Sequence, residues 1–116
     1  MTRNLDASQR FLFEQADVRG ELVRLGPALS ELLDTQAYSQ SVRRLLGEFA
    51  AAAVLISNNL KYTGRIILQA RSEAALSLVM AECSSERHIR GIAQGDLSAS
   101  AIDPMTLLQN GQLALT

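Results

Sequence analysis

Apolar residues recur at helical spacing in the middle of the chain, from about residue 39 to 60. The positions that repeat every three or four residues are Val42, Leu45, Leu46, Phe49, Ala53, Ile56 and Leu60. This period predicts an amphipathic helix with one face in a core. Ser39 or Ser41 is the expected N-cap, because a serine hydroxyl accepts a hydrogen bond from the first helical turn. Asn58 and Asn59 are expected to end the helix.

The second half of this helix loses its polar face. Residues 50–56 are four alanines followed by valine, leucine and isoleucine. A helix that is apolar on all sides is buried on most of them. We therefore expect residues 50–56 to be almost wholly buried, with the helix sandwiched between other elements or laid tightly on a sheet.

A shorter helix is predicted over about residues 27–35. Pro27 suits a first helical position, where its missing N–H costs nothing. Leu29, Leu32 and Leu33 form one apolar stripe. Only a few residues separate this helix from the long one, so the two are expected to be neighbours in space.

Apolar and polar residues alternate on both sides of the helices, which indicates strands. The predicted strands are 11–13, 18–25, 64–71, 76–83, 88–93 and 112–116. In the third of these, Ile66, Leu68 and Ala70 are expected to be buried. In the fourth, Leu76, Leu78 and Met80 should share one face, and Ser77, Val79, Ala81 and Cys83 the other. A helical turn is expected after Asp103-Pro104, and the side chains it directs inward are Met105, Leu107 and Leu108.

The order of these elements decides the fold class. Two strands precede the helices, and a three-stranded meander, a turn and a last strand follow them. Strands that cluster without regular alternation with helices favour an α+β fold with a largely antiparallel sheet. The chain has 116 residues, of which 47% are apolar, so we expect one domain, 1–116, with a single core.

Composition excludes several classes of protein. Eleven basic and twelve acidic residues balance, so the electrostatic footprint of a nucleic-acid binder is absent. The longest apolar run, residues 49–56, is much shorter than the ~20 residues of a membrane-spanning helix. The first residues lack the apolar segment of a secretory signal.

Candidate chemistry rests on few side chains. The chain lacks the glycine-rich nucleotide-binding motifs and the nucleophile-elbow motif of hydrolases. His88 is the sole histidine and Cys83 the sole cysteine, which argues against a multi-cysteine zinc site. We expect His88 to be a solvated strand residue and Cys83 a packed apolar one; the alternatives are a catalytic base and a reactive thiol.

Acidic and arginine residues offer two further candidates. The pairs Glu21 and Glu31, and Asp96 and Asp103, lack a spacing that places two carboxylates on one face. The dipeptides Arg19-Gly20 and Arg90-Gly91 place glycine inside predicted strands. Such glycines indicate a β-bulge or a close backbone approach, and we expect bulges with both arginines on the wet face. The functional alternative is that one arginine holds a partner's carboxylate or a neighbouring acidic side chain.

The last predicted strand stops with the chain, at Thr116. Natural strands at a sheet edge are usually protected by charges, proline or a covering element, and residues 112–116 have none of these. The chain therefore looks cut, and we expect its open edge to recruit a second copy in a homodimer or a higher oligomer.

Five motifs in a fixed order resemble the heat shock protein 33 family of redox-regulated bacterial chaperones. They are RFLFE (10–14), VRGELV (18–23), LKYTG (60–64), RGIA (90–93) and LLQNG (107–111). The leucine stripe at 29–33, Tyr38 and the helix 41–60 follow the same order. The resemblance covers about residues 9–115 and implies the N-terminal part of the family's chaperone core, a twisted sheet with helices packed on it.

The resemblance also implies a function. The family consists of cytoplasmic, ATP-independent holdases that capture unfolding proteins under oxidative and heat stress, and it is not enzymatic. A separate C-terminal module of the family holds zinc through four cysteines that this chain does not have, so we expect no cofactor or metal here. The alternatives are a structural fragment that mainly self-associates and a small enzyme that uses His88 or Cys83.

Overall fold

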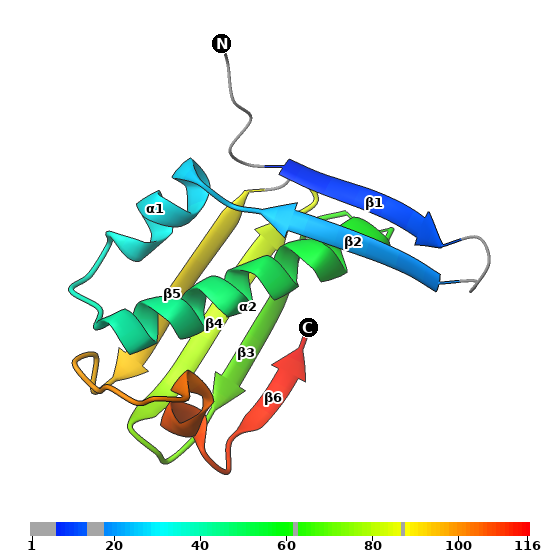
Figure 1. Ribbon diagram of the computed structural model, residues 1–116. Helices are drawn as coiled ribbons and strands as arrows, with labels where there is room; N and C mark the ends of the chain where they lie inside the picture. The colour runs from blue at the N-terminus through cyan, green and yellow to red at the C-terminus, as the bar shows by residue number, and fades with distance from the viewer. Residues whose placement is uncertain (1–6, 14–17, 62, 87) are drawn as a thin grey trace.

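The computed structural model describes residues 7–13, 18–61, 63–86 and 88–116 (Figure 1). Its elements, in chain order, are β1 (Ala7–Phe13), β2 (Val18–Arg24), α1 (Pro27–Leu33), α2 (Gln40–Asn59), β3 (Arg65–Arg71), β4 (Leu76–Ser84), β5 (Ile89–Gly95), the 3₁₀ helix η1 (Pro104–Leu108) and β6 (Gln112–Leu115). Every strand pairing among these residues is antiparallel. The α+β class is confirmed, but the strands form two sheets: a hairpin of β1 and β2, and a four-stranded sheet in the order β5-β4-β3-β6.

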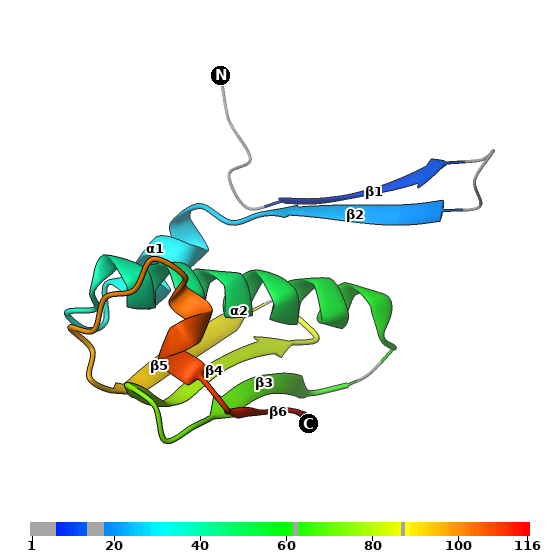
Figure 2. The same cartoon turned by 60° about the horizontal axis from the view of Figure 1, so that its bottom comes forward.

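The molecule is layered around α2. Figure 2 shows α1, α2 and η1 on one side of the four-stranded sheet, and the hairpin on the opposite side of α2 from that sheet. The core lies between α2 and the sheet. Its largest fully enclosed apolar side chains are Val42, Leu45, Leu46, Leu76, Val79 and Cys83. Within the described residues, no helix combines the length and apolar character that crossing a membrane requires.

The predicted helices begin and end close to their expected residues. Ser39 caps α2, because its side chain accepts a hydrogen bond from the N–H of Val42 at 3.2 Å. The first strand, however, begins at Ala7 rather than at residue 11. The first four residues of β1 show no alternation of apolar and polar side chains. They are strand residues because they pair with β2, in a register that places Ala7 opposite Arg24.

The expectation that residues 50–56 are almost wholly buried is wrong in part. Ala50, Ala53 and Val54 are buried, whereas Ala51, Ala52, Leu55 and Ile56 are only half-buried. The sheet covers one side of the helix. The hairpin crosses the other side but leaves hollows, one of which is lined by Phe11, Gly20 and Leu55.

The strand faces follow the predicted alternation, with one exception. Ile66, Leu68 and Ala70 are buried, as expected. In β4, the alternation places Val79, Ala81 and Cys83 in the core, but Leu76 is also fully buried. A register shift between Leu76 and Leu78 breaks the period there. The prediction that Leu76 shares a face with Leu78 and Met80 is therefore wrong, and so is the grouping of Ser77 with the buried Val79, because Ser77 is exposed.

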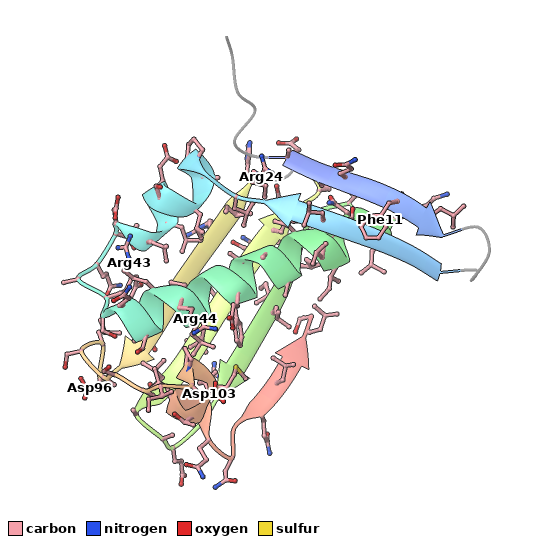
Figure 3. The ribbon with its side chains drawn as sticks, viewed as in Figure 1. Phe11, Arg24, Arg43, Arg44, Asp96 and Asp103 are labelled. Atoms are coloured by element: carbon pink, nitrogen blue, oxygen red, sulfur yellow. The ribbon has the colours of Figure 1, made fainter. Side chains whose placement is uncertain are left out.

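The predicted bulges at Gly20 and Gly91 are absent, because the register runs through both positions without a shift. Each glycine instead permits a close approach. A Cβ on Gly20 would lie 2.1 Å from the Phe11 ring, which sits across the hairpin (Figure 3). A Cβ on Gly91 would lie 3.1 Å from Leu32 and 3.2 Å from Leu46. Glycine at these sites therefore makes room for side chains of neighbouring elements.

The C-terminal segment differs from its prediction in one residue. Leu107 and Leu108 are buried, but Met105 is 52% exposed rather than inward. The side chains of the 3₁₀ helix that are buried are Pro104, Leu107 and Leu108. After it, β6 pairs with β3 and places Leu113 beside Ala70 and Leu115 beside Leu68.

One carboxylate fixes the hairpin to the end of α2. Glu21, whose side chain is nearly buried, lies 3.5 Å from Arg10 Nε. Its two oxygens accept hydrogen bonds from Asn58 at 3.2 Å and Asn59 at 2.8 Å. Arg10 also donates to the carbonyl of Asn58, and a cation is favourable at the C-terminus of a helix. The asparagines that end α2 thus also hold the hairpin.

The first prediction concerns the two sides of α2. Ala53→Asp places a charge at a fully buried position, and we expect it to lower the free energy of unfolding by ~3 kcal/mol or more. Ala52→Asp, one residue away and half-buried, is the matched control and should cost about 1 kcal/mol or less. Urea denaturation of both variants tests this, and equal losses would contradict the burial difference.

The second prediction concerns the hairpin anchor. Glu21→Ala removes the acceptor shared by Arg10, Asn58 and Asn59, so the hairpin should open more often while the four-stranded sheet stays closed. We expect hydrogen-exchange protection of the β1 and β2 amides to fall about tenfold. Glu31→Ala, on the exposed side of α1, is the control. A uniform loss over hairpin and sheet would show that Glu21 supports the whole fold instead.

Candidate functional site

The two residues considered for chemistry lie in different surroundings. Cys83 is fully buried in the core, and its Sγ donates a weak hydrogen bond to the Ser84 carbonyl at 3.5 Å. His88 is exposed just before β5, and its backbone N–H donates to Ser84 Oγ at 3.0 Å. A buried thiol is inaccessible to a substrate, so Cys83 acts as a packed apolar residue.

The acidic pairs do not form catalytic dyads. Glu21 is bound by the hairpin and α2, whereas Glu31 is exposed on α1. Asp96 accepts from Ser98, and Asp103 caps η1 by accepting from the N–H of Met105 at 3.1 Å. Both of these aspartates serve loop structure near the start of α2 (Figure 3). Within the part of the chain that the structure describes, no three His, Cys, Asp or Glu side chains group as metal ligands would.

The two arginines considered for recognition have different outcomes. The side chain of Arg19 lies outside the described residues. Arg90 lies opposite Glu82 in the register of β5 and β4, with Arg90 Nε 3.8 Å from Glu82 Oε2. The alternative in which an arginine holds a neighbouring acidic side chain is therefore confirmed for Arg90.

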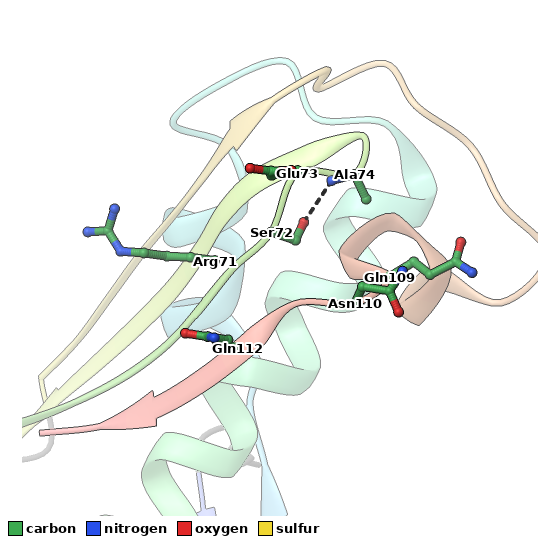
Figure 4. Close-up of a pocket in the computed structure, with 7 residues that line it drawn as sticks. All are labelled: Arg71, Ser72, Glu73, Ala74, Gln109, Asn110 and Gln112. Atoms are coloured by element: carbon green, nitrogen blue, oxygen red, sulfur yellow. Dashed lines mark hydrogen bonds between the residues drawn. The ribbon is translucent and has the colours of Figure 1, made fainter.

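A polar hollow of about 580 Å³ lies between the β3–β4 turn and the segment that leads into β6 (Figure 4). Ser72 Oγ accepts from the N–H of Ala74 at 3.2 Å, which closes the turn on itself. The side chains of Arg71 and Gln109 point away from each other. Polar groups that do not converge make a poor ligand site, so this hollow serves the turns.

The face of the four-stranded sheet opposite α2 is the most extensive candidate surface. Figure 2 shows no described element covering it. The register places on it the alternate residues of each strand. Its larger apolar members, Ile67, Leu78, Met80 and Ile92, lie on three neighbouring strands and are half-buried. We call this surface the open sheet face.

Arginines surround the apolar part of the open sheet face. Glu82, with a side chain only 9% exposed, lies between two of them: Arg65 Nη1 is 3.1 Å from its Oε1, and Arg90 is on its other side. Arg71 lies on the same face without a described acidic partner. One carboxylate therefore offsets part of the charge of three arginines, and the surface is apolar in its middle and positive at its borders.

A second apolar surface lies at the β6 edge. A hollow of about 300 Å³ is lined by Phe49, Ala52, Leu68, Met105 and Leu113, among others. Leu113 and Leu115 are 67% and 51% exposed, although they face the same side of the sheet as α2. Among the described residues, β6 pairs only with β3, so its outer edge is open and its exposed leucines form an apolar flank. We call this surface the β6 flank.

The sequence contained a signal for the open sheet face that the strand analysis missed. Ile67, Met80 and Ile92 occupy positions that alternate with core residues, so a purely solvated face would favour polar side chains there. Their apolar character is the signal. Glu82 had no signal of its own, because only the register shows that it lies between Arg65 and Arg90.

Comparison with known proteins agrees with these observations. The family model described as Hsp33 protein matches residues 6–116. The 33 kDa chaperonin of Pseudomonas syringae pv. syringae (strain B728a) is 49% identical over 115 residues, which are 97% of this chain. That of Ectopseudomonas mendocina (strain ymp) is 50% identical over 113 residues, or 96% of the chain. The chain spans 38% of the length of each relative.

The match extends over nearly the whole chain and includes every region described above, from the hairpin to β6. It also includes the five motifs that first indicated a chaperone. The chain therefore belongs to the Hsp33 family.

Proposed function

We propose that this chain binds unfolding polypeptides as a holdase chaperone, without ATP, and that the open sheet face is the surface that binds them. The observation that carries this proposal is the apolar group of Ile67, Met80 and Ile92 on a sheet face that no described element covers. Unfolding proteins expose apolar segments, and burial of apolar surface is the dominant favourable term in most protein associations.

The arginines suit the same role. Arg65, Arg71 and Arg90 stand around the apolar group, and arginine side chains combine an apolar stem with a charged end. A client segment that buries its apolar side chains on Ile67 and Ile92 would meet these charges at its borders. Exposed apolar segments differ in sequence from client to client. A surface that binds through apolar contact and charge, rather than through a sequence motif, can accept a broad range of them.

Further parts of the proposal follow the family resemblance. We propose that the chain is not an enzyme, because its one thiol is buried and its histidine is exposed just before β5. We also propose that it acts in the cytoplasm under heat and oxidative stress. The family's redox switch needs cysteines that residues 1–116 do not contain, so Cys83 is proposed to have no part in zinc binding or in oxidant sensing.

The test is suppression of aggregation. The wild-type chain at up to tenfold molar excess should reduce light scattering by a heat-labile test protein. The double variant Ile67→Thr and Ile92→Thr keeps β-branched side chains, which suit a strand, but removes apolar surface. We expect its suppression to fall several-fold. Leu22→Thr makes a similar change at an exposed hairpin position and should leave suppression unchanged.

Two results would contradict the proposal. The absence of suppression by the wild-type chain would argue against a holdase. Equal suppression by the double variant, with its fold verified by circular dichroism, would show that the open sheet face is not the client surface.

We propose self-association through the β6 flank as a second function, and the observation in its favour is the exposure of Leu113 and Leu115 beside an open edge. The groups of Ile67 and Thr116 bond to each other, so the N–H and C=O groups of Leu113 and Leu115 point away from β3. Pairing of two copies there would join two sheets and bury both apolar flanks. Stable dimers usually bury ~800 Å² per partner.

Sedimentation at micromolar concentration tests this second proposal. We expect the wild-type chain to sediment as a dimer or larger species. Leu113→Lys places a charge on the β6 flank and should shift the chain toward monomer, as lysine does at natural sheet edges. Leu60→Lys, at an exposed apolar position at the end of α2, is the control. A wild-type monomer at these concentrations would contradict the proposal.

A further inference from the structure

A cleft of about 560 Å³ lies between α1 and β5, at the edge of the four-stranded sheet opposite β6. Figure 1 shows α1 to the outer side of β5, and Figure 2 shows that α1 lies above the level of the strands, on the same side as α2. Among the described residues, β5 pairs only with β4. The cleft is lined from α1 by Ala28, Glu31 and Leu32, and from β5 by Ile89 to Ile92.

The backbone of β5 presents hydrogen-bonding groups to this cleft. The N–H of Ala93 donates to Tyr38 Oη at 3.4 Å and therefore points away from β4. The N–H of Ser84 donates to the His88 carbonyl at 2.9 Å, so His88 directs its backbone toward β4. Directions alternate along an antiparallel strand. The N–H and C=O groups of Ile89 and Gly91 thus point outward, as those of Ala93 do, and no described residue bonds to them.

Tyr38 and Gly91 explain why the edge is open at this place. Tyr38 is buried and occupies the outward N–H at the far end of β5. At Gly91, the missing side chain lets Leu32 and Leu46 approach from the helical side. Leu32 therefore anchors α1 above the strand, and the edge below it has room for an added strand.

The two sides of the cleft differ in chemistry. On the helical side, Ala28 and Leu32 offer apolar contacts beside the polar side chains of Glu31, Thr35 and Gln36. On the open sheet face, Arg90 and Ile92 alternate along β5. The Arg90 side chain pairs with Glu82 at 3.8 Å and is still 76% exposed, so it is accessible to a client segment. A strand laid beside β5 would direct alternate side chains to these two sides.

We propose that this cleft binds an extended segment of a client polypeptide, which adds a strand to β5 by backbone hydrogen bonds to Ile89 and Gly91. This mode of recognition is known as β-augmentation. The favoured segment alternates apolar residues, which face Leu32, with residues of which one is acidic and lies beside Arg90. That the segment comes from a client rests on the proposed holdase function. That it binds as an added strand rests only on the structure around β5.

A single extended segment fits this edge better than a second copy of the chain does. The cleft is roofed by α1, and its volume lies in the ~300–1,000 Å³ range of small-ligand pockets. Two copies paired through β5 would bring both Arg90 side chains to one junction and would need space for two α1 helices. An exposed acidic residue of a client offers the opposite charge.

The test uses a capped seven-residue peptide of alternating valine and glutamate, titrated into the full 116-residue chain and followed by NMR. We expect chemical-shift changes and increased hydrogen-exchange protection at the amides of Ile89 and Gly91. The same peptide with an N-methyl group on every residue has no backbone N–H to donate to the edge and should bind at least tenfold more weakly. A peptide with lysine in place of glutamate should also bind more weakly.

A matched pair of variants isolates the edge. Ile89→Pro removes one outward N–H without removing a ladder hydrogen bond, and proline is tolerated at such edge positions. Ile89→Ala loses a similar amount of side chain and keeps the N–H. We expect the proline variant to bind the peptide at least tenfold more weakly than the alanine variant. If the proline variant does not fold, the N-methyl comparison on the wild-type chain decides.

Each outcome separates this inference from the proposed function. Equal binding of the plain and N-methylated peptides would overturn it, as would shift changes confined to the open sheet face or the β6 flank. Concentration-dependent shifts at β5 without peptide would indicate pairing of two copies and would also overturn it. Aggregation suppression that persists with no binding at β5 would leave the holdase proposal intact and reject only the β5 cleft.

Discussion

The packing of α2 against one face of the four-stranded sheet is the constraint on which the rest of the structure depends. Val42, Leu45 and Leu46 are fully enclosed there, and burial of each such side chain contributes about 1.5–3 kcal/mol. The stripe they form fixes which face of the sheet is covered. Because α1 and η1 also pack on that side, the opposite face is left for the arginines and for a smaller set of apolar residues.

Strand geometry explains why a packed core and an apolar outer surface coexist in so short a chain. Successive side chains point to opposite faces, so each core residue of β4 has a neighbour on the open sheet face. Cys83 and Ala81 are in the core, and Glu82 between them is held by Arg65 and Arg90. Burying an unpaired charge is costly. The two arginines pair with the nearly buried Glu82 carboxylate, so this carboxylate is tolerated on a partly apolar surface.

The sequence predicted the elements well and their joint arrangement less well. Helical spacing located α2 to within a residue or two, because its apolar stripe and the Ser39 cap are local signals. The two sheets, the half-burial of Ala52 and the outward Met105 depend on where other elements lie. Gly20 and Gly91 illustrate the limit: glycine in a strand indicated a special position, but only the fold shows that Phe11 and Leu32 need the space. The open sheet face could be predicted from apolar residues at positions that alternate with core residues. The contacts of Glu82 could not, because they depend on the pairing register of the strands.

The three exposed features of this chain differ in what they demand of a partner. The open sheet face offers apolar area and charge but no backbone groups, so it favours contact through side chains. The β6 flank and the β5 edge offer unpaired strand edges, which demand an extended partner backbone. The two edges also differ from each other. Exposed leucines lie beside β6, whereas α1 and Arg90 lie beside β5. An unfolding polypeptide has both exposed apolar side chains and unpaired backbone groups. Under the proposed holdase function, the uncovered sheet face and the neighbouring β5 edge would meet these two kinds of group in one client segment.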